Sequence, residues 1–266
     1  NLGGWDLSPN KAWIIIQNRG NFLSKFSFKN FARIWSTPLS SPLSADPKYS
    51  QNSDFIYLGT RDGSIKKISA VSGQISWQQK LDSPLYQAPQ IVGDSLLTIT
   101  MSQKIYCLDL EKGTPKWVFN AGSKGLVIRS RQSIAIYSDM VLVNLSNGEI
   151  LSLNLKNGTL IWRYQIHGLK SQAESIHSSA IMTQPIVLKN KLYFSTRSGL
   201  LASLNLQDKK RPQEQPKTLI KNNSEAVTAV KFQSPLLYIG RANGSVSIVN
   251  LRSEDKPIQE LKNLAP

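Results

Sequence analysis

Few side chains in this 266-residue sequence are of types that could do chemistry, and they are not clustered. There is one cysteine, Cys107, and there are two histidines, His167 and His177. A lone cysteine can form no internal disulfide, and the histidines lack the His-x-x-x-His spacing of a zinc site. We therefore expect no metal site, a buried structural thiol at Cys107 within the apolar stretch KIYCL, and two solvated loop histidines.

The carboxylates give the same result. The 17 acidic residues are spread along the chain and form no clustered pair that could serve as general acid and base. The motifs of serine hydrolases, phosphate-binding loops and zinc proteases are absent. We predict that the protein is not an enzyme, with no catalytic residue, no cofactor and no small-molecule substrate.

The net charge of +15, from 32 basic and 17 acidic residues, raises the question of an anionic partner. No aromatic–basic nucleic-acid motif accompanies it. We interpret the charge as a solvated surface; docking of an acidic protein is the second interpretation, and nucleic-acid binding ranks third. The basic residues are dispersed, at Lys66–Lys67, Lys209–Arg211, Arg129, Arg131 and Arg163.

The residues discussed above lie in a chain that contains an internal sequence repeat. With Gly63 as origin, apolar residues follow at +2 and +5, a small polar residue at +6, glycine at +10 and tryptophan at +14. The same offsets recur from Gln103 to Trp117 and from Gly148 to Trp162. Three matches of this length indicate a structural repeat.

Each repeat predicts antiparallel strands. Apolar, β-branched runs stop at Asp62–Gly63 and Asn147–Gly148, which are turn sequences that join two strands. A second turn contains the +10 glycine, and a third strand then begins with the tryptophan; the stretch APQIVGDSLLTIT supplies a further strand and turn. Such a small sheet cannot cover its own apolar faces, so it must stack on copies of itself, as propeller blades do. The tryptophans are then expected to pack between neighbouring blades.

Three weaker copies complete the count. One has its origin at Gly20, with Phe22 at +2 and Trp35 at +15, which implies one extra residue in its second turn. The others begin at Gly199 and Gly244 and lack the tryptophan. We predict an all-β fold, a β-propeller of about six four-stranded blades in a single domain spanning 1–266. The approximate blades are 1–45, 46–85, 86–124, 125–168, 169–222 and 223–266. The C-terminal PIQELKNL either completes the last blade or pairs with the strand around Trp5.

The block from Tyr57 to Asn205 resembles the quinoprotein-type propeller repeat, with its G-x-φ-x-x-φ-D/N and G-x-x-x-W signature. The connections KWVFNAGSKGLVIRSRQS and HGLKSQAESIHSSAIMTQPIV resemble the partner-binding loops of the BamB family, propeller lipoproteins of the outer-membrane β-barrel assembly machinery. True quinoprotein dehydrogenases are similar in blade pattern only, since the vicinal disulfide typical of them needs two cysteines.

The resemblance implies a partner-binding site in the first connection. The family's Leu-x-Leu-Arg segment is matched by Leu126, Ile128 and Arg129, and Arg131 follows closely. In the second connection, the two acidic positions expected before the proline fall on Ala180 and Met182, so that part of the family's docking surface is not carried over. The family also usually has eight blades and an N-terminal lipid-acceptor cysteine, which is absent here.

The resemblance implies a non-catalytic interaction scaffold of the bacterial cell envelope that assists outer-membrane protein assembly. Its location would be the periplasm, at the inner face of the outer membrane, and its partner the periplasmic domains of a barrel-assembly subunit. Membrane attachment would need an N-terminal lipid anchor, which this chain does not contain. Alternatives are another envelope or lumenal interaction propeller, such as a secretion-system component or a stress-sensor ectodomain, and then a basic nucleic-acid-binding propeller. Because the sequence begins at Asn1 without methionine, it leaves open whether a signal peptide was removed.

Overall fold

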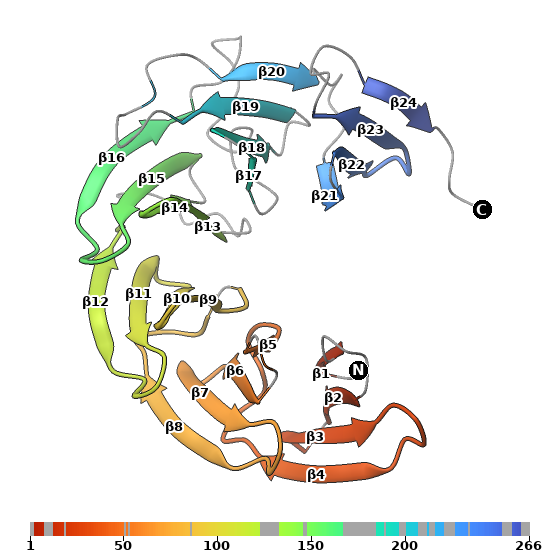
Figure 1. The fold of residues 1–266 in the computed structure, drawn as a ribbon, viewed down its shortest axis with the longest axis vertical. Helices are drawn as coiled ribbons and strands as arrows, with labels where there is room; N and C mark the ends of the chain where they lie inside the picture. Colours follow the sequence, from red (N-terminus) through yellow and green to blue (C-terminus); the bar gives the residue numbers. More distant parts are fainter. Residues whose placement is uncertain are drawn as a thin grey trace. The chain divides into compact units, whose positions relative to one another are not determined.

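The computed structural model describes residues 3–7, 13–18, 20–50, 52, 54–85, 87–122, 133–145, 148–166, 185–188, 190–196, 201–206, 212, 216–220, 227–233, 235–251 and 257–261. Within these ranges all regular secondary structure is β-strand (Figure 1). No helix in them is long and apolar enough to cross a membrane. The strands form six four-stranded sheets. The predicted all-β fold with six four-stranded propeller blades is confirmed.

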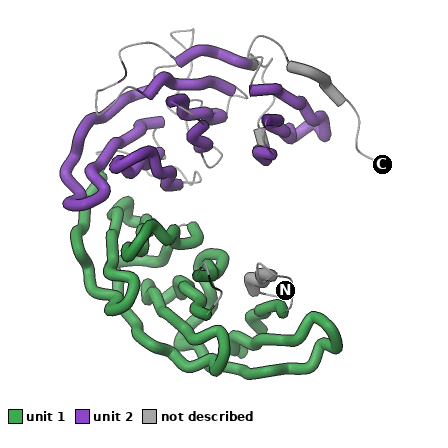
Figure 2. Tube along the Cα trace, in the orientation of Figure 1, with its two compact units in different colours: residues 1–122 green, residues 123–266 purple. Residues whose placement is uncertain are grey.

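The described residues divide into two compact units, 1–122 and 123–266 (Figure 2). The single domain spanning 1–266 stays a prediction. The first unit holds three sheets: β1 (Gly3–Leu7), β2 (Trp13–Gln17), β3 (Phe22–Ser27) and β4 (Arg33–Pro38); β5 (Lys48–Tyr49), β6 (Phe55–Gly59), β7 (Ser64–Ser69) and β8 (Ile75–Lys80); β9 (Gln90–Val92), β10 (Ser95–Ile99), β11 (Lys104–Asp109) and β12 (Pro115–Asn120).

The second unit also holds three sheets. They consist of β13 (Ser133–Tyr137), β14 (Met140–Asn144), β15 (Glu149–Asn154) and β16 (Leu160–Gln165); β17 (Ile186–Leu188), β18 (Lys191–Ser195), β19 (Leu201–Asn205) and β20 (Lys217–Ile220); β21 (Val227–Gln233), β22 (Leu236–Arg241), β23 (Val246–Asn250) and β24 (Pro257–Leu261). In every sheet, consecutive strands pair antiparallel. Because β24 pairs with β23, the C-terminal stretch completes the sixth blade.

The repeat origin is a left-handed turn between the second and third strands of a blade. The backbone φ angle is +82° at Gly63, +78° at Gly148 and +79° at Gly244. At Gly63 the N–H donates a hydrogen bond to the carbonyl of Thr60, which closes the turn. Glycine suits this conformation because it has no Cβ to collide with the backbone. Gln103 adopts the same conformation, with φ +65°.

The first repeat differs from the prediction. Its left-handed residue is Asn21, with φ +59°, whereas Gly20 does not have a positive φ. Asparagine tolerates this conformation better than most residues, so it can replace glycine in the turn. Counted from Asn21, Trp35 lies at +14, in register with the other repeats, and the predicted origin at Gly20 was wrong.

The second turn of this repeat has the ordinary length. Phe31 occupies the +10 position with φ +53°, and its N–H donates to the carbonyl of Ser27. Gly73 donates to Ser69 in the same way in the next blade. The predicted extra residue is therefore wrong as well. The strand that carries the tryptophan, which is the fourth strand of the blade, also begins earlier than predicted. In the second blade this strand, β8, starts at Ile75 rather than Trp77.

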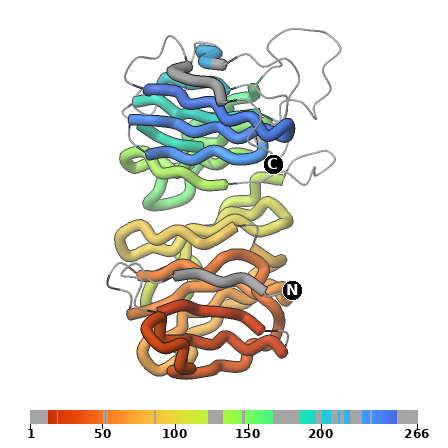
Figure 3. The backbone as a smooth tube through the Cα atoms, turned by 90° about the vertical axis from the view of Figure 1, so that its right-hand side faces the viewer, coloured from red at the N-terminus to blue at the C-terminus, as the bar shows by residue number. Residues whose placement is uncertain are grey.

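The core lies between adjacent sheets of each unit. Figure 3 shows the backbone of these sheets from the side. In the first unit, Ile15 and Leu23 of the first sheet meet Ile56 and Ile68 of the second. The opposite face of the second sheet packs against the third sheet in the same manner. In the second unit, two further clusters join β13–β16 to β17–β20 and β17–β20 to β21–β24. Each blade therefore depends on a neighbour to bury its apolar faces.

Two of the tryptophans dock on a glycine of the following blade. A Cβ added at Gly73 would come within 2.7 Å of the Trp35 ring, and one added at Gly113 within 2.5 Å of the Trp77 ring. The Trp35 indole N–H also donates to the Ala70 carbonyl (3.1 Å), and that of Trp77 to the Leu110 carbonyl (3.2 Å). Packing between blades is thus confirmed for both tryptophans.

Trp35 and Trp77 are partly buried, whereas Trp117 and Trp162 are buried, with 9% and 5% of their surface exposed. Trp162 belongs to the cluster between β13–β16 and β17–β20, as predicted. Cys107 is 1% exposed, which confirms a buried thiol, and burial raises its pKa so that it stays protonated.

Lys66 and Lys67 are not solvated, and that part of the surface interpretation was wrong. Each is only 2% exposed. The Lys67 ammonium pairs with Glu111 of the next blade at 2.7 Å and lies 4.0 Å from the centre of the Phe55 ring. The Lys66 ammonium donates to the Gln78 side chain, and burial lowers its pKa. Carboxylate, amide and aromatic partners make burial of these cations tolerable.

Candidate functional site

The predicted partner-binding residues, Leu126, Ile128, Arg129 and Arg131, lie outside the described residues. The same holds for His167 and His177, and for Ala180 and Met182. The structure does describe the chain up to Gly122 and again from Ser133. The candidate site is therefore described by the residues that flank segment 123–132, up to Gly122 on one side and from Ser133 on the other.

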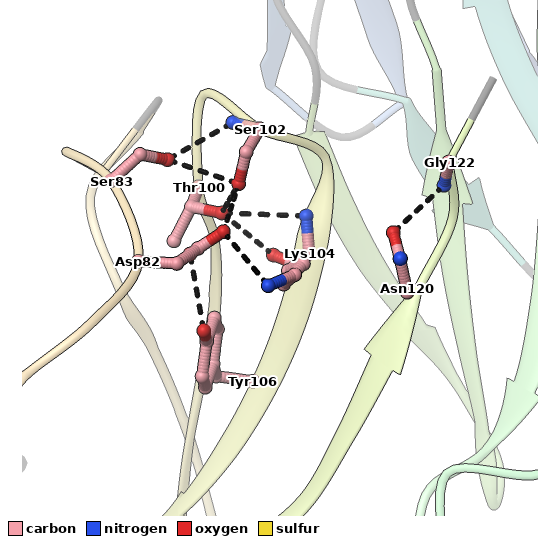
Figure 4. A network of polar contacts seen from close by, with 8 residues as sticks. All are labelled: Asp82, Ser83, Thr100, Ser102, Lys104, Tyr106, Asn120 and Gly122. Carbon is pink, nitrogen blue, oxygen red and sulfur yellow. Dashed lines mark hydrogen bonds and ion pairs between the residues drawn. The ribbon is translucent and has the colours of Figure 1, made fainter. Parts of the chain in front are cut away.

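The chain leaving β12 is held by two hydrogen bonds. The Ala121 N–H donates to the carbonyl of Gln103 (3.1 Å), and the Gly122 N–H donates to the Asn120 side chain (3.1 Å; Figure 4). Asn120 itself pairs with Lys104 at the end of the β11–β12 ladder. The exit from β12 is thus fixed against the turn that joins β10 to β11.

The chain that follows the segment is equally well held. Ser133 begins β13 and pairs with Asn144 of β14. The Ser133 hydroxyl donates to the Asn144 side-chain oxygen at 2.7 Å, and both residues are at most 2% exposed. A buried, satisfied polar pair of this kind fixes the start of the strand.

A polar network centred on Asp82 braces the same turn (Figure 4). Asp82 follows β8, and its carboxylate accepts hydrogen bonds from the Ser102 hydroxyl and from the Tyr106 hydroxyl (3.1 Å). The Lys104 ammonium lies 3.3 Å from the carboxylate. Burial raises the pKa of Asp82, but these donors outweigh it and the pKa lies below its usual value.

The network also involves the connection between the blades. The Ser83 hydroxyl accepts from the Ser102 N–H at 3.0 Å, and the Thr100 hydroxyl contacts the Ser102 hydroxyl at 3.0 Å. Every oxygen of the Asp82 carboxylate is therefore engaged within the protein. This arrangement positions a connection and a turn.

The preceding blade has the same brace with the partners exchanged. There the Ser40 hydroxyl, in the connection, donates to the Asp62 carboxylate, in the turn, at 2.7 Å. In the third blade the carboxylate is in the connection, at Asp82, and the hydroxyl is in the turn, at Ser102. Sequence reasoning missed this pair, although the recurrence of Leu-x-Ser-Pro-Leu at residues 39–43 and 81–85 could have revealed the shared connection.

The comparison with known families decides the affiliation. The family model described as "Outer membrane protein assembly factor BamB" matches residues 23–255 of this chain. The chain belongs to this family. The sequence-level resemblance to quinoprotein-like repeats and to the BamB family is thereby confirmed.

Individual relatives are distant. The BamB of Yersinia pestis is 23% identical over 152 residues, which cover 57% of this chain and 39% of that protein. The BamB of Legionella pneumophila is 27% identical over 235 residues, covering 72% and 61%. The chain thus spans only part of the length of the curated relatives it matches.

A solved structure agrees on the fold. The crystal structure of BamB from Moraxella catarrhalis superposes with a TM-score of 0.77 at 19% identity, covering 97% of this chain and 76% of that one. The C-terminal WD40 domain of Sif2 superposes with a TM-score of 0.74 at 12% identity. Because unrelated propellers give nearly the same score, this likeness supports the fold and carries no function.

Proposed function

We propose that this BamB-family chain is a non-catalytic protein–protein interaction scaffold of the bacterial cell envelope that assists outer-membrane protein assembly. The observation that carries the proposal is the family match over residues 23–255. The relatives bear the name of outer membrane protein assembly factor, which is said of them. Applied to this chain, it implies a periplasmic location at the inner face of the outer membrane, a protein partner and no small-molecule substrate.

The docking residues in this proposal are Leu126, Ile128, Arg129 and Arg131. Apolar side chains that flank an arginine have the composition of interface hot spots. Leu126 and Ile128 would act as apolar anchors, and Arg129 would bond a carboxylate or a strand edge of the partner. The partner would be the periplasmic domains of a barrel-assembly subunit.

The hydrogen bonds around the segment support this role. Ala121 and Gly122 at one end, and Ser133 at the other, are fixed by the bonds described above. A binding segment that starts and ends on rigid strands loses less conformational entropy when it docks. The Asp82 network adds to this rigidity by holding the turn that contacts the exit from β12.

Capture of purified periplasmic domains of a barrel-assembly subunit tests the proposal. Wild type is compared with the double change Leu126→Asp, Arg129→Glu, which removes an apolar anchor and reverses a charge. We expect wild type to capture the bait and the variant to lose most of the capture while its thermal unfolding is unchanged.

A matched control carries the same chemical changes elsewhere. Ile34→Asp with Arg33→Glu alters an exposed apolar residue (51% exposed) and an exposed arginine on β4. This control should capture as well as wild type. If the Leu126–Arg129 variant also captures normally, the segment is not the interface; if wild type captures nothing, the assembly role itself is contradicted.

A further inference from the structure

The turn between β3 and β4, at the end of their hairpin (Figure 1), carries two exposed phenylalanines. Phe28 is 47% and Phe31 is 68% exposed, and their ring centroids lie 5.9 Å apart. Ile34, in the adjoining part of β4, is 51% exposed. We call residues 28–34 the hairpin end. Large apolar side chains that gather on one short segment, rather than singly over a surface, indicate a contact site.

Phe31 presents its ring from a strained backbone. Its φ is +53°, and a bulky side chain is a rare outlier in this left-handed region. The turn is nevertheless well closed, because the Phe31 N–H donates to the Ser27 carbonyl and the Ser27 N–H donates to the Ala32 carbonyl, both at 2.9 Å. Glycine would fit the same conformation without strain. A strained residue whose ring is exposed to solvent points to a function rather than to stability.

The hairpin end is not suited to receive a preceding blade. In the second and third blades the position equivalent to Phe31 is glycine, at Gly73 and Gly113, and the tryptophan of the preceding blade packs where a Cβ would begin. Phe31 has a left-handed backbone as well, but it has a Cβ and a ring in that place. An indole cannot dock on this turn in the same way, so the exposed rings are accessible to another partner.

The charged residues of the hairpin end are basic. Lys29 and Arg33 are exposed, and neither forms an ion pair with a carboxylate among the described residues. The sequence has no acidic residue between Asp6 and Asp46. Exposed apolar side chains next to basic ones complement the surface of a bilayer that contains anionic lipids. Its headgroups attract the cations, and the boundary of its acyl chains accepts the rings.

A protein partner fits these observations less well. A stable protein–protein interface takes about 20–30 residues from each side. The hairpin end offers three exposed apolar side chains, at Phe28, Phe31 and Ile34. Contact with a bilayer needs only a few such side chains together with nearby basic residues. The small size of the cluster and the sign of its charge therefore favour a membrane.

We propose that the hairpin end is a membrane-contact site. Phe28, Phe31 and Ile34 enter the surface of a bilayer that contains anionic lipids, and Lys29 and Arg33 bind its headgroups. Such a contact is weak and reversible by itself, unlike a membrane-spanning segment. It orients the propeller on a membrane and does not depend on the proposed function.

Cosedimentation of the full chain with vesicles of equal parts phosphatidylglycerol and phosphatidylcholine tests the proposal. Phe31→Gly removes the ring and the backbone strain and leaves the charge unchanged. We expect vesicle binding to weaken by roughly tenfold or more, as the loss of one buried phenyl ring implies. The unfolding temperature should not fall, whereas a merely structural role of Phe31 would lower it. Val71→Ser, at an exposed residue in the equivalent turn of the second blade (72% exposed), is the matched control and should bind as wild type does.

A second pair of variants separates the hairpin end from the net charge of the chain. Lys29→Glu with Arg33→Glu should lose most of the vesicle binding. Lys112→Glu with Lys156→Glu reverses two exposed lysines in the equivalent turns of the third and fourth blades and should retain most of it. If both double variants lose binding equally, the net charge alone attracts the vesicles and the inference is overturned.

Two further results would overturn it: wild type that does not sediment with the vesicles, and Phe31→Gly that binds them as wild type does. If Phe31→Gly instead weakens capture of the periplasmic domains and leaves vesicle binding unchanged, the hairpin end contacts a protein and the inference is wrong. The variant Ile34→Asp with Arg33→Glu links the two assays, because it should capture normally and lose vesicle binding. Wild type that binds vesicles but captures nothing would contradict the assembly role and leave the membrane contact standing.

Discussion

At the scale of single residues, glycine and tryptophan form complementary pairs across neighbouring blades. The indoles of Trp35 and Trp77 lie where a side chain would begin at Gly73 and Gly113. Both glycines also have positive φ, of +75° and +73°. The conformation and the close approach each favour glycine, and the two effects can be separated by experiment.

We predict that Gly113→Ala destabilises the protein much more than Gly93→Ala. Gly93 has φ +57°, but a Cβ added there would meet no heavy atom within 4 Å, so alanine costs only the backbone strain, roughly 1–2 kcal/mol. At Gly113 the methyl group would also collide with Trp77, which adds about 1–3 kcal/mol. Urea unfolding of the two variants measures the difference. Equal effects would show that the Trp77 contact contributes nothing.

The glycine–tryptophan spacing could be predicted from the sequence, because tryptophan is rare and its offset from the glycines is constant in three repeats. The left-handed conformations of Asn21 and Phe31 could not be predicted. Residues other than glycine rarely adopt this conformation, so nothing in the sequence marks the ones that do. The burial of Lys66 and Lys67 could not be predicted from the sequence either. It depends on partners such as Glu111, which is close only after the sheets have stacked.

At the scale of elements, the interface between β5–β8 and β9–β12 contains a buried tyrosine. Tyr57 is 1% exposed and its ring contacts that of Trp77, with centroids 6.1 Å apart. Burial, together with the nearby Glu111 carboxylate, raises the pKa of Tyr57 from 10.0 to about 12. The neutral phenol is therefore favoured in the folded protein.

This pKa shift predicts a loss of stability at alkaline pH. Because the folded pKa is above the unfolded one, the contribution is complete below pH 10 and disappears as the pH rises toward 12. A rise of this size corresponds to roughly 3 kcal/mol at most. Urea unfolding of wild type and Tyr57→Phe between pH 9 and about 12 measures it. The phenylalanine variant should lose less stability over this interval, and parallel curves would contradict the prediction.

The number and order of the strands could be predicted because each hairpin carries its own turn signal. The brace between connection and turn could not, because its two members exchange residue types. Ser40 and Asp62 in one blade become Asp82 and Ser102 in the next, so neither position shows a constant residue. The hydrogen bond is retained while the sequence at each position changes.

At the scale of the whole molecule, the charge is distributed differently from what composition suggests. Part of the net charge of +15 comes from Lys25, Lys66 and Lys67, which are at most 8% exposed and make contacts between or within sheets. Lys25 donates to the Ala70 carbonyl of the next blade at 2.7 Å. The ammonium groups of Lys25 and Lys67 contact the next blade, and that of Lys66 contacts Gln78 of its own sheet, so all three are engaged inside the protein.

The predicted single domain spanning 1–266 has a direct test. Within each unit, adjacent sheets share their apolar cores, so a blade cannot unfold without exposing its neighbour. For a single domain we expect one cooperative heat-absorption peak whose calorimetric and van't Hoff enthalpies agree. Scanning calorimetry makes the measurement. Two resolved peaks would mean that 1–122 and 123–266 unfold independently, and the single-domain prediction would be wrong.

Because tryptophans dock on glycines of the neighbouring blade, intrinsic tryptophan fluorescence can be used to follow the contacts between blades. An indole covered by a neighbouring sheet emits at a shorter wavelength than one in water, so the emission of Trp35 and Trp77 depends on whether adjacent blades remain in contact. Backbone circular dichroism, in contrast, follows the strands. A state in which the blades had separated while their strands stayed intact would therefore be visible as a red-shifted emission with an unchanged β spectrum, without any added label.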